Sequence, residues 1–502
     1  MLAAIPSAAV LGIDGHVVIV EAHVSAGLPA YDLVGLPDAA GRESRQRVRA
    51  AILSSSLEWP MRKITVNLAP AVVRKAGTGL EAAIACGVLL ASGQLPSHCL
   101  DRTAVLGELG LDGTLRHVPG TLVLVDALAR AGYERVIVPI GSAREASLVH
   151  GIEVLPASTL ADMRAALCGE WFWADIPELV DGAEAVPPAL DDALDLGEVR
   201  GLSMARHALT ACAAGGHHLL FVGEPGAGKT MLARRLPSIL PTLSHEHALE
   251  VTRVHSAAGH LANGCLVTDQ PFRAPHHGAS APALIGGGSN GRVRLGEITL
   301  AHRGTLFLDE LGEFNPTVLD ALRQPLEDHV VRVCRSGISV ELPSDFVLVA
   351  CCNPCPCGLS ADSCRCSDVQ RQRYRRRLSA PLLDRFDLRI LVEGPAASDH
   401  RGECSEVVRE QVETAVAIQR LRFDGTCLRR NAEIPQRLLE HYAPLSAGAD
   451  SALRDIAELR GLSGRGVARM WRVARTLADL DAVDVVAQAH IELASTMREE
   501  IV

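Results

Sequence analysis

The residues best suited to chemistry form a glycine-rich loop that begins at position 223. Positions 223–230 read GEPGAGKT, which fits the pattern G-x-x-x-x-G-K-[S/T] without a mismatch. The apolar HLLFV precedes the loop and the helix-forming MLARRL follows it, so the expected order is strand, loop and helix. Backbone amides of such a loop point at phosphate oxygens, and the helix N-terminus adds a positive dipole. The predicted nucleotide-binding residues are Gly223, Glu224, Pro225, Gly226, Ala227, Gly228, Lys229 and Thr230.

A second element, TLFLDE at 305–310, supplies the acids that nucleotide hydrolysis needs. We expect a buried strand that ends by presenting Asp309 to Mg²⁺, which Thr230 would also bind, and Glu310 to the attacking water. Lys229 would reach the β- and γ-phosphates. The sequence therefore predicts an ATP hydrolase that uses Mg²⁺.

Three polar residues further along the chain could complete such a site. FVLVACCN ends at Asn353, which would orient the water if the strand ends beside the γ-phosphate, although an asparagine can also simply terminate a strand. Arg385 lies in SAPLLDRFD, where its two flanking acids also allow a simple surface ion pair. Arg465 lies at the start of a basic helix in GLSGRGVARMWRVART.

Length and composition indicate a soluble protein of several domains. The 502 residues exceed one ordinary hydrophobic core. Apolar residues make up 48% and charged residues 22%, as in globular proteins. No apolar stretch has membrane-spanning length, and the N-terminus lacks the basic leader of a signal peptide, so we expect no membrane partner. Fourteen cysteines without an export signal indicate reduced thiols and a cytoplasmic location.

Patterning divides the chain into four parts. Residues 1–175 alternate β-branched runs with Ala-rich helical stretches, which indicates an α/β domain. Residues 176–197 are acidic and contain prolines, as in an exposed linker. Residues 198–395 hold the nucleotide-binding motifs. Residues 396–502 have apolar positions at helical spacing, which predicts a C-terminal helical domain.

Several motifs together resemble a known family. Five motifs resemble the magnesium-chelatase-like branch of the AAA+ ATPases: GEPGAGKT, LFLDEL, CNPCPCG, LLDRFD and the GLSGRG helix. Three further motifs narrow the resemblance to the ComM/YifB family: PFRAPHH, GEITLAHRGTLFLDEL and LRQPLE. Members of this family are implicated as ring-shaped DNA helicases in branch migration during DNA uptake and recombination. The resemblance implies an α/β fold: an AAA+ P-loop core with helices on both faces of a parallel sheet, a Lon-like (ribosomal-S5-domain-2-like) N-terminal domain and a helical lid. It also implies that Asn353 is sensor 1, Arg385 an arginine finger and Arg465 the sensor 2 arginine.

An arginine finger makes hydrolysis depend on assembly, because the finger acts on the nucleotide of a neighbouring subunit. A closed homo-oligomeric ring, expected to be a hexamer, is therefore the predicted active form. Arg377, in YRRRLSAPLLDRFD, competes with Arg385 for this role, since the sequence alone cannot aim either arginine.

Two segments are expected to form hairpins that face the channel of the ring. The glycine-rich stretch at 271–298 resembles the helix-2 insertion of this AAA+ branch, and HVVRVCRSGISVEL at 329–342 fits a pre-sensor-1 hairpin. The net charge of −10 still permits local basic surfaces. Hairpin arginines would bind the phosphates of single-stranded or branched DNA independently of sequence, although solvated surface arginines are the alternative. The candidates are Arg292, Arg294, Arg332 and Arg335.

A cysteine cluster follows Asn353. Cys355, Cys357, Cys364 and Cys366 form two close pairs around a short loop, a set that can bind Zn²⁺ through four thiolates. One residue separates the members of each pair, where two are commoner, so free buried thiols or an oxidation-prone patch are alternatives. Zinc would stiffen the chain here and would perform no chemistry. The histidine pair of PFRAPHH could also suggest a metal, but no carboxylate is in register with it.

The N-terminal domain resembles the proteolytic domain of Lon proteases without its catalytic residues. A Ser–Lys dyad needs a hydroxyl and a nearby amine. Gly79 stands at the expected serine position, with Thr78 adjacent, and Leu122 stands at the lysine position. The domain is therefore predicted to be inactive and to engage DNA or a partner. A possible basic face, which could equally be ordinary helix surface, consists of Arg42, Arg45, Arg47 and Arg49.

Two other functions would use the same ATPase core. A magnesium-chelatase motor subunit would depend on integrin-like and porphyrin-binding partner proteins, and the Lon-like domain speaks against it. A remodeller of polypeptides would need apolar or aromatic pore loops, whereas those here are basic and glycine-rich. DNA translocation is the primary hypothesis.

Overall fold

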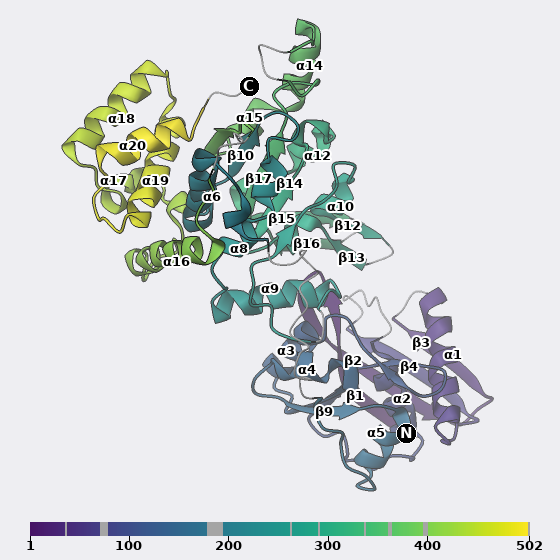
Figure 1. The fold of residues 1–502 in the computed structure, drawn as a ribbon. Helices are drawn as coiled ribbons and strands as arrows, with labels where there is room; N and C mark the ends of the chain where they lie inside the picture. The colour runs from purple at the N-terminus through teal and green to yellow at the C-terminus, as the bar shows by residue number, and fades with distance from the viewer. Residues whose placement is uncertain are drawn as a thin grey trace.

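Two lobes, joined at helix α9 (His245–Ala257), make up the molecule (Figure 1). The computed structural model describes residues 1–35, 38–70, 79–177, 194–261, 264–289, 292–335, 338–359, 364–394 and 400–499, with the side chains at 38–41, 289, 292, 335 and 338 outside the description. Within these ranges no helix is both long enough and apolar enough to span a bilayer.

The larger lobe is built on a five-stranded parallel sheet. Its spatial order is β11–β14–β17–β10–β18, and every pairing is parallel. All five carboxyl ends therefore meet at one edge of the sheet. The predicted α/β fold of a P-loop ATPase is confirmed. The strands are β10 (Leu219–Val222), β11 (Phe272–Arg273), β14 (Thr305–Leu308), β17 (Val347–Cys352) and β18 (Leu388–Leu391).

Apolar side chains cover both faces of this sheet. All four residues of β10 are buried, and their side chains alternate between two hydrophobic clusters. Leu219 and Phe221 face the cluster that includes the C-terminal helices, whereas Leu220 and Val222 face the cluster beneath the hairpins. A strand buried on both faces needs a continuous apolar run, which explains why the motif strands read LLFV, TLFL and VLVACC.

The C-terminal helices share one hydrophobic cluster with α6 (Ser203–Gly215) and the sheet. A buried ion pair lies among them, between Arg475 and Asp479, whose side chains are both fully buried and 2.8 Å apart. Asp479 also accepts hydrogen bonds from Arg422 at 2.7 Å and Asn431 at 2.7 Å. The longest helices of this C-terminal part are α16 (Ser405–Arg422), α18 (Ala447–Leu459), α19 (Gly464–Leu480) and α20 (Gln488–Thr496).

The N-terminal lobe combines helices with three small sheets, one of which is the two-stranded pair β6 (Glu108–Leu109) and β7 (Leu115–Arg116). Of the other two, the first has the order β1–β2–β4–β3, and the second is parallel with the order β5–β8–β9. Helix α2 (Glu81–Ala91) is almost wholly buried because it packs on β1 and β2 on one side and on α1 on the other. The remaining bounds are β1 (Leu2–Leu11), β2 (Asp14–Ser25), β3 (Ala30–Val34), β4 (Lys63–Ala69), β5 (Thr103–Val105), β8 (Arg135–Pro139), β9 (Glu153–Ala157) and α1 (Asp38–Ser54).

Polar and apolar contacts join the two lobes. Helix α9 packs against α3 (Thr121–Arg130) of the N-terminal lobe, where Arg253 lies 3.0 Å from Asp126. Ser256 donates a hydrogen bond to Glu145 at 2.5 Å. The tight β1–β2 turn meets the hairpin β15 (Val330–Arg335)–β16 (Ile338–Pro343) so closely that a Cβ at Gly12 would lie 2.4 Å from Val340.

Removing the buried carboxylate of the C-terminal helices should destabilise the protein. Asp479→Ala would leave the guanidinium of Arg475 buried without its charge partner, which typically costs about 3–5 kcal/mol. The matched control is Asp450→Ala, because Asp450 forms an exposed i,i+4 pair with Arg454, and this loss should stay under about 1 kcal/mol. Urea denaturation measures both variants, and equal midpoints would contradict the assignment.

Candidate active site

The glycine-rich loop lies between β10 and α7 (Lys229–Ala233). Gly226 and Gly228 have φ of +82° and +94°, in the left-handed region that favours glycine. Lys229 donates hydrogen bonds to the carbonyls of Gly223 at 2.6 Å and Glu224 at 2.8 Å. Its burial lowers the pKa of the ammonium group. The loop thus curls around a cation at the start of a helix, as phosphate binding requires.

The acidic pair follows β14 at the same edge of the sheet. Thr230 Oγ1 donates to Asp309 Oδ2 at 3.0 Å, so a hydroxyl and a carboxylate from different elements lie together. Oxygen ligands of these two kinds suit Mg²⁺, which typically takes one or two protein ligands alongside nucleotide phosphates. The arrangement therefore fits a magnesium nucleotide.

Glu310 has an unusual backbone and an unexpected partner. Its φ of +52° is in the left-handed region, which is uncommon outside glycine and often marks functional sites. Its carboxylate lies 2.9 Å from Nδ1 of His277. The histidine pair of PFRAPHH thus contacts the acid expected to activate water. The two histidines of PFRAPHH do not form a metal site with other described residues. The side chains that are grouped closely enough to hold a metal ion are Cys355, Cys357, Cys364 and Cys366.

Asn353 joins the same group of side chains. It follows β17, and its Oδ1 accepts a hydrogen bond from Lys229 at 3.2 Å. The backbone carbonyl of Asn353 accepts another from the hydroxyl of Tyr374 at 3.1 Å. Tyr374 belongs to α14 (Asp368–Arg377). The carboxyl ends of β10, β14 and β17 thus bring Lys229, the acidic pair and Asn353 together.

Arg385 lies at the opposite edge of the sheet. It follows α15 (Ala380–Leu383) and precedes β18, which runs parallel to β10 with Leu388 beside Leu219. The glycine-rich loop begins only after Val222, at the other end of β10. The length of this strand, about 10 Å, therefore separates the segment of Arg385 from the loop. Arg385 pairs instead with Glu327, and its Nε is buried without a hydrogen-bond partner among the described residues. Arg385 is therefore poorly placed to reach the loop of its own chain.

The acids that flank Arg385 do not pair with it; the ion pair considered above forms with Glu327 instead. Asp384 and Asp387 lie 3.1 Å and 3.5 Å from Arg469 of α19. These contacts tie the segment that carries Arg385 to the helix that carries Arg465. Arg465 itself lies in the first turn of α19 and is exposed.

The competing arginine, Arg377, faces the acidic segment of its own chain. Its Nη1 donates to the carbonyl of Gly312 at 3.2 Å and lies 3.5 Å from Glu313. Gly312 is two residues beyond Glu310 in the chain.

The hairpin arginines occupy different settings. Arg294 is exposed and lines a cavity between the lobes, and Arg332 lies 2.8 Å from Glu341 across the β15–β16 hairpin. The side chains of Arg292 and Arg335 lie outside the description. The hairpin of β12 (Gly286–Ser289) and β13 (Arg292–Leu295) packs beside β15 (Figure 1).

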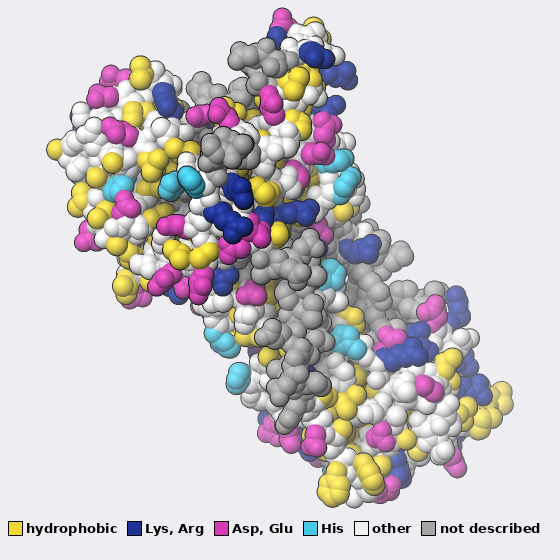
Figure 2. Space-filling view, viewed as in Figure 1, with side chains coloured by type: hydrophobic (Ala, Val, Ile, Leu, Met, Phe, Trp, Pro, Cys, Tyr) yellow, Lys and Arg dark blue, Asp and Glu magenta, His cyan; other side chains and the backbone are white. Residues whose placement is uncertain are grey.

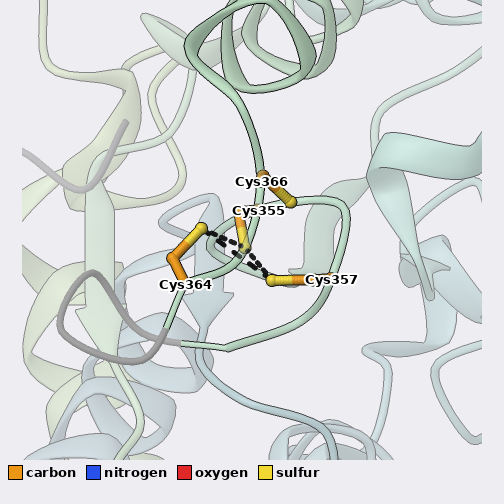
Figure 3. A group of neighbouring side chains, drawn as sticks. All are labelled: Cys355, Cys357, Cys364 and Cys366. Atoms are coloured by element: carbon orange, nitrogen blue, oxygen red, sulfur yellow. Dashed lines mark hydrogen bonds between the residues drawn. The ribbon is translucent and has the colours of Figure 1, made fainter.

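The four cysteines come together after Asn353 (Figure 3). All four sulfurs lie within 4.8 Å of one another, and three pairs are 3.1 Å, 3.5 Å and 3.8 Å apart. A zinc ion with Zn–S bonds of about 2.3 Å in a tetrahedron would set the sulfurs about 3.8 Å apart. Hydrogen bonds from Cys355 and two backbone amides lower the pKa of Cys357 to about 6. The geometry fits a tetrathiolate metal site.

The positions compared above with a Ser–Lys dyad serve the packing of the N-terminal lobe. Gly79 has no room for a side chain, because a Cβ would lie 2.8 Å from Val118. Leu122 is buried, and Thr78 lies outside the described residues. Arg47 binds Glu81 at 2.7 Å and Arg45 lies over the ring of Tyr31, so these two arginines serve internal contacts.

Comparison with known proteins identifies the family. The profile described as "Magnesium chelatase, subunit ChlI" matches residues 195–400, and those of "Subunit ChlI of Mg-chelatase" and "Magnesium chelatase, subunit ChlI C-terminal" match 20–142 and 402–498. Competence protein ComM of Haemophilus influenzae is 40% identical over 496 residues, 98% of this chain and 96% of ComM. The chain belongs to the ComM/YifB family.

Other ComM/YifB relatives cover the chain equally well. The uncharacterised protein YifB of Escherichia coli is 38% identical over 507 residues, 99% of this chain and 97% of YifB. An uncharacterised protein of Mycobacterium tuberculosis is 44% identical over 481 residues, 94% of each chain. The ComM/YifB family lies within the magnesium-chelatase-like AAA+ ATPases, and AAA+ proteins characteristically assemble into oligomers.

Sequence reasoning missed three residues around this site in the ComM/YifB chain: His277, Tyr374 and Arg469. Each lies in a motif that was noticed, but its partner is distant in sequence and comes from another element. The signal for His277 lay in PFRAPHH itself, because Phe272 and Arg273 of this motif form β11, the strand that pairs with β14.

Releasing Glu310 from His277 should raise basal ATP hydrolysis. The carboxylate oxygen that faces His277 must leave the histidine before it can accept a proton from water. An exposed pair of this kind is worth up to about 1 kcal/mol, which corresponds to at most about a fivefold rate difference. His277→Ala is therefore expected to be faster than wild type in a phosphate-release assay. His276→Ala is the control, because it removes the adjacent ring, whose centroid lies 4.0 Å from that of His277, but leaves the contact between His277 and Glu310 in place. A slower or unchanged His277→Ala enzyme would show that the contact does not restrain Glu310.

Proposed function

We propose that this protein is a ring-forming ATPase that couples ATP hydrolysis to movement along single-stranded or branched DNA. The observation that supports assembly into a ring is that the length of β18 separates Arg385 from the glycine-rich loop of the same chain. A site that needs a late positive charge at the γ-phosphate would obtain it from the next subunit. We infer a hexamer built from the four parts predicted above, at 1–175, 176–197, 198–395 and 396–502.

Each residue of the site has a proposed role in the reaction. Thr230 and Asp309 would hold Mg²⁺, which neutralises charge on the β- and γ-phosphates when bound. Glu310 would accept a proton from the water that attacks the γ-phosphorus, as the bond to the bridging oxygen breaks and ADP leaves. Asn353 would orient that water. Arg385 of a neighbour and Arg465 would stabilise the negative charge.

The DNA partner is supported by the two adjacent hairpins. Arg294 and Arg332 are exposed, and the ion pair of Arg332 with Glu341 is itself exposed. Exposed ion pairs are worth at most about 1 kcal/mol, so a phosphate can replace the carboxylate. Contacts of this kind would bind DNA regardless of sequence. Arg292 and Arg335 remain candidates for the same surface.

A second candidate is a magnesium-chelatase-type motor subunit that acts with protein partners. The magnesium-chelatase 38 kDa subunit of Acidiphilium rubrum is 28% identical over 308 residues, which is 54% of this chain. This function predicts hydrolysis that is indifferent to DNA but accelerated by chelatase partner proteins.

A steady-state ATPase assay with and without single-stranded and branched DNA tests the proposal. We expect DNA to stimulate wild type, Lys229→Ala to lose nucleotide binding, and Arg385→Ala to retain binding but to hydrolyse about 10³-fold more slowly or worse. Mixing the two inactive variants should restore part of the activity, because each supplies the group the other lacks. No recovery of ATPase activity at any mixing ratio would contradict the assignment of Arg385 as an arginine finger.

We also propose that Cys355, Cys357, Cys364 and Cys366 hold a structural zinc ion. Purified protein should contain about one zinc per chain, and a Co²⁺-substituted form should show the absorption of tetrahedral thiolate coordination. Cys364→Ser should lose the metal and lower the melting temperature, whereas Cys427→Ser, at an exposed cysteine elsewhere, should change neither. A wild-type protein that binds no zinc when supplied with it would contradict the assignment.

A further inference from the structure

Helix α14 carries a dense positive charge. Its ten residues include five arginines and one acid, in a chain whose net charge is −10. The helix projects from the end of the larger lobe in Figure 1, and Figure 2 shows Lys and Arg side chains gathered there. Like charges three or four residues apart destabilise a helix, although the three arginines of the last turn also interact favourably with the helix dipole.

The outer side of α14 presents three of these arginines to solvent. Arg373, Arg375 and Arg376 are exposed, and within the described part of the chain no ion pair involves them. At 100° per residue, position 376 lies opposite the buried Tyr374, with positions 373 and 375 on either flank. Arg371, in contrast, pairs with Asp368 at 2.7 Å.

The inner side of α14 touches the active site. Tyr374 is only 6% exposed, and its hydroxyl donates to the carbonyl of Asn353 at 3.1 Å. Its ring lies against Gly312, where a Cβ would come within 2.4 Å of the ring. Arg377 donates to the carbonyl of Gly312. One helix therefore contacts both the water-orienting asparagine and the segment that follows Glu310.

The base of α14 is fixed next to the nucleotide loop. Cys366 directly precedes Ser367, which forms a capping box with Gln370. In the same cysteine-containing segment, a Cβ at Gly358 would lie 2.8 Å from the ring of Pro225. The cysteine cluster thus anchors the helix beside the loop that would hold the phosphates.

We propose that α14 is an arm that binds the phosphate backbone of nucleic acid and transmits that binding to the nucleotide site through Tyr374. The inference rests on the DNA-dependent function proposed above. Protein interfaces are anchored by buried aromatic and apolar side chains, yet Val369 is the single exposed apolar side chain of α14. Phosphates need only the guanidinium groups. The surface therefore suits nucleic acid better than the face of a second copy.

The salt dependence of DNA binding tests the outer side. In fluorescence anisotropy with a labelled single-stranded oligonucleotide, the triple variant R373Q/R375Q/R376Q should bind more weakly. Its slope of log affinity against log salt should be shallower by about 2, since each lost phosphate contact contributes about 0.7. Basal ATPase without DNA should stay within about twofold of wild type, because none of the three side chains touches the active site.

A matched control removes the same charge elsewhere. R420Q/R429Q/R437Q neutralises three exposed arginines in the C-terminal part of the chain and should leave the slope unchanged. If the α14 variant keeps the wild-type slope while wild type binds DNA, the arm is refuted and the motor function stands. If the α14 variant has fewer subunits per particle than wild type in light scattering, the outer side of α14 is an interface between copies of the chain and the arm is refuted. If wild type itself ignores DNA, the proposed function fails and the arm with it.

Tyr374→Phe tests transmission, because it removes only the hydroxyl that bonds Asn353. DNA affinity, salt slope and melting temperature should remain close to wild type, while the ratio of DNA-stimulated to basal hydrolysis should fall several-fold. Full stimulation in this variant would show that the signal takes another route. A parallel loss of basal activity and melting temperature would instead indicate a purely structural tyrosine.

Discussion

Parallel strand direction is the constraint on which the site depends. Because β10, β14 and β17 run the same way, residues that follow each of them converge at one edge even though they are spread from position 229 to position 353. The same rule sends Arg385, which precedes β18, to the far edge. The shared direction of the strands therefore brings the acids and the lysine together, and it also places Arg385 away from them.

Buried charges hold the surrounding parts in position. Asp345 lies 2.5 Å from Arg303 and 2.7 Å from Arg430, so one carboxylate links the sheet to the C-terminal helices. Burial alone would raise its pKa, but the guanidinium groups of Arg430 and Arg303 hold that pKa well below its usual range. Arg303 also binds Glu250 of α9, the helix that contacts the N-terminal lobe. A buried charge without a partner is costly. Here each charged group contacts the next, from Glu250 through Arg303 and Asp345 to Arg430.

The sequence was sufficient for features encoded locally. The glycine-rich loop, the strand ending in Asp309 and the strand ending in Asn353 each carry their signal within a dozen residues, and the α/β fold follows from their apolar runs. The partners of side chains could not be predicted, because they depend on packing between distant segments. Asp384 and Asp387 flank Arg385 in the chain but bind Arg469 in the structure. The contact between His277 and Glu310 likewise needs two neighbouring strand ends in three dimensions.

The tight turn at Gly12 has a consequence for comparing relatives. Its φ is +68°, and any side-chain carbon added there would stand 2.4 Å from Val340, so this position accepts little besides glycine while Val340 stays in place. Two stretches more than three hundred residues apart thus share one small space. Chimeras that exchange the first lobe between family members would need to carry a compatible β16 strand along with it.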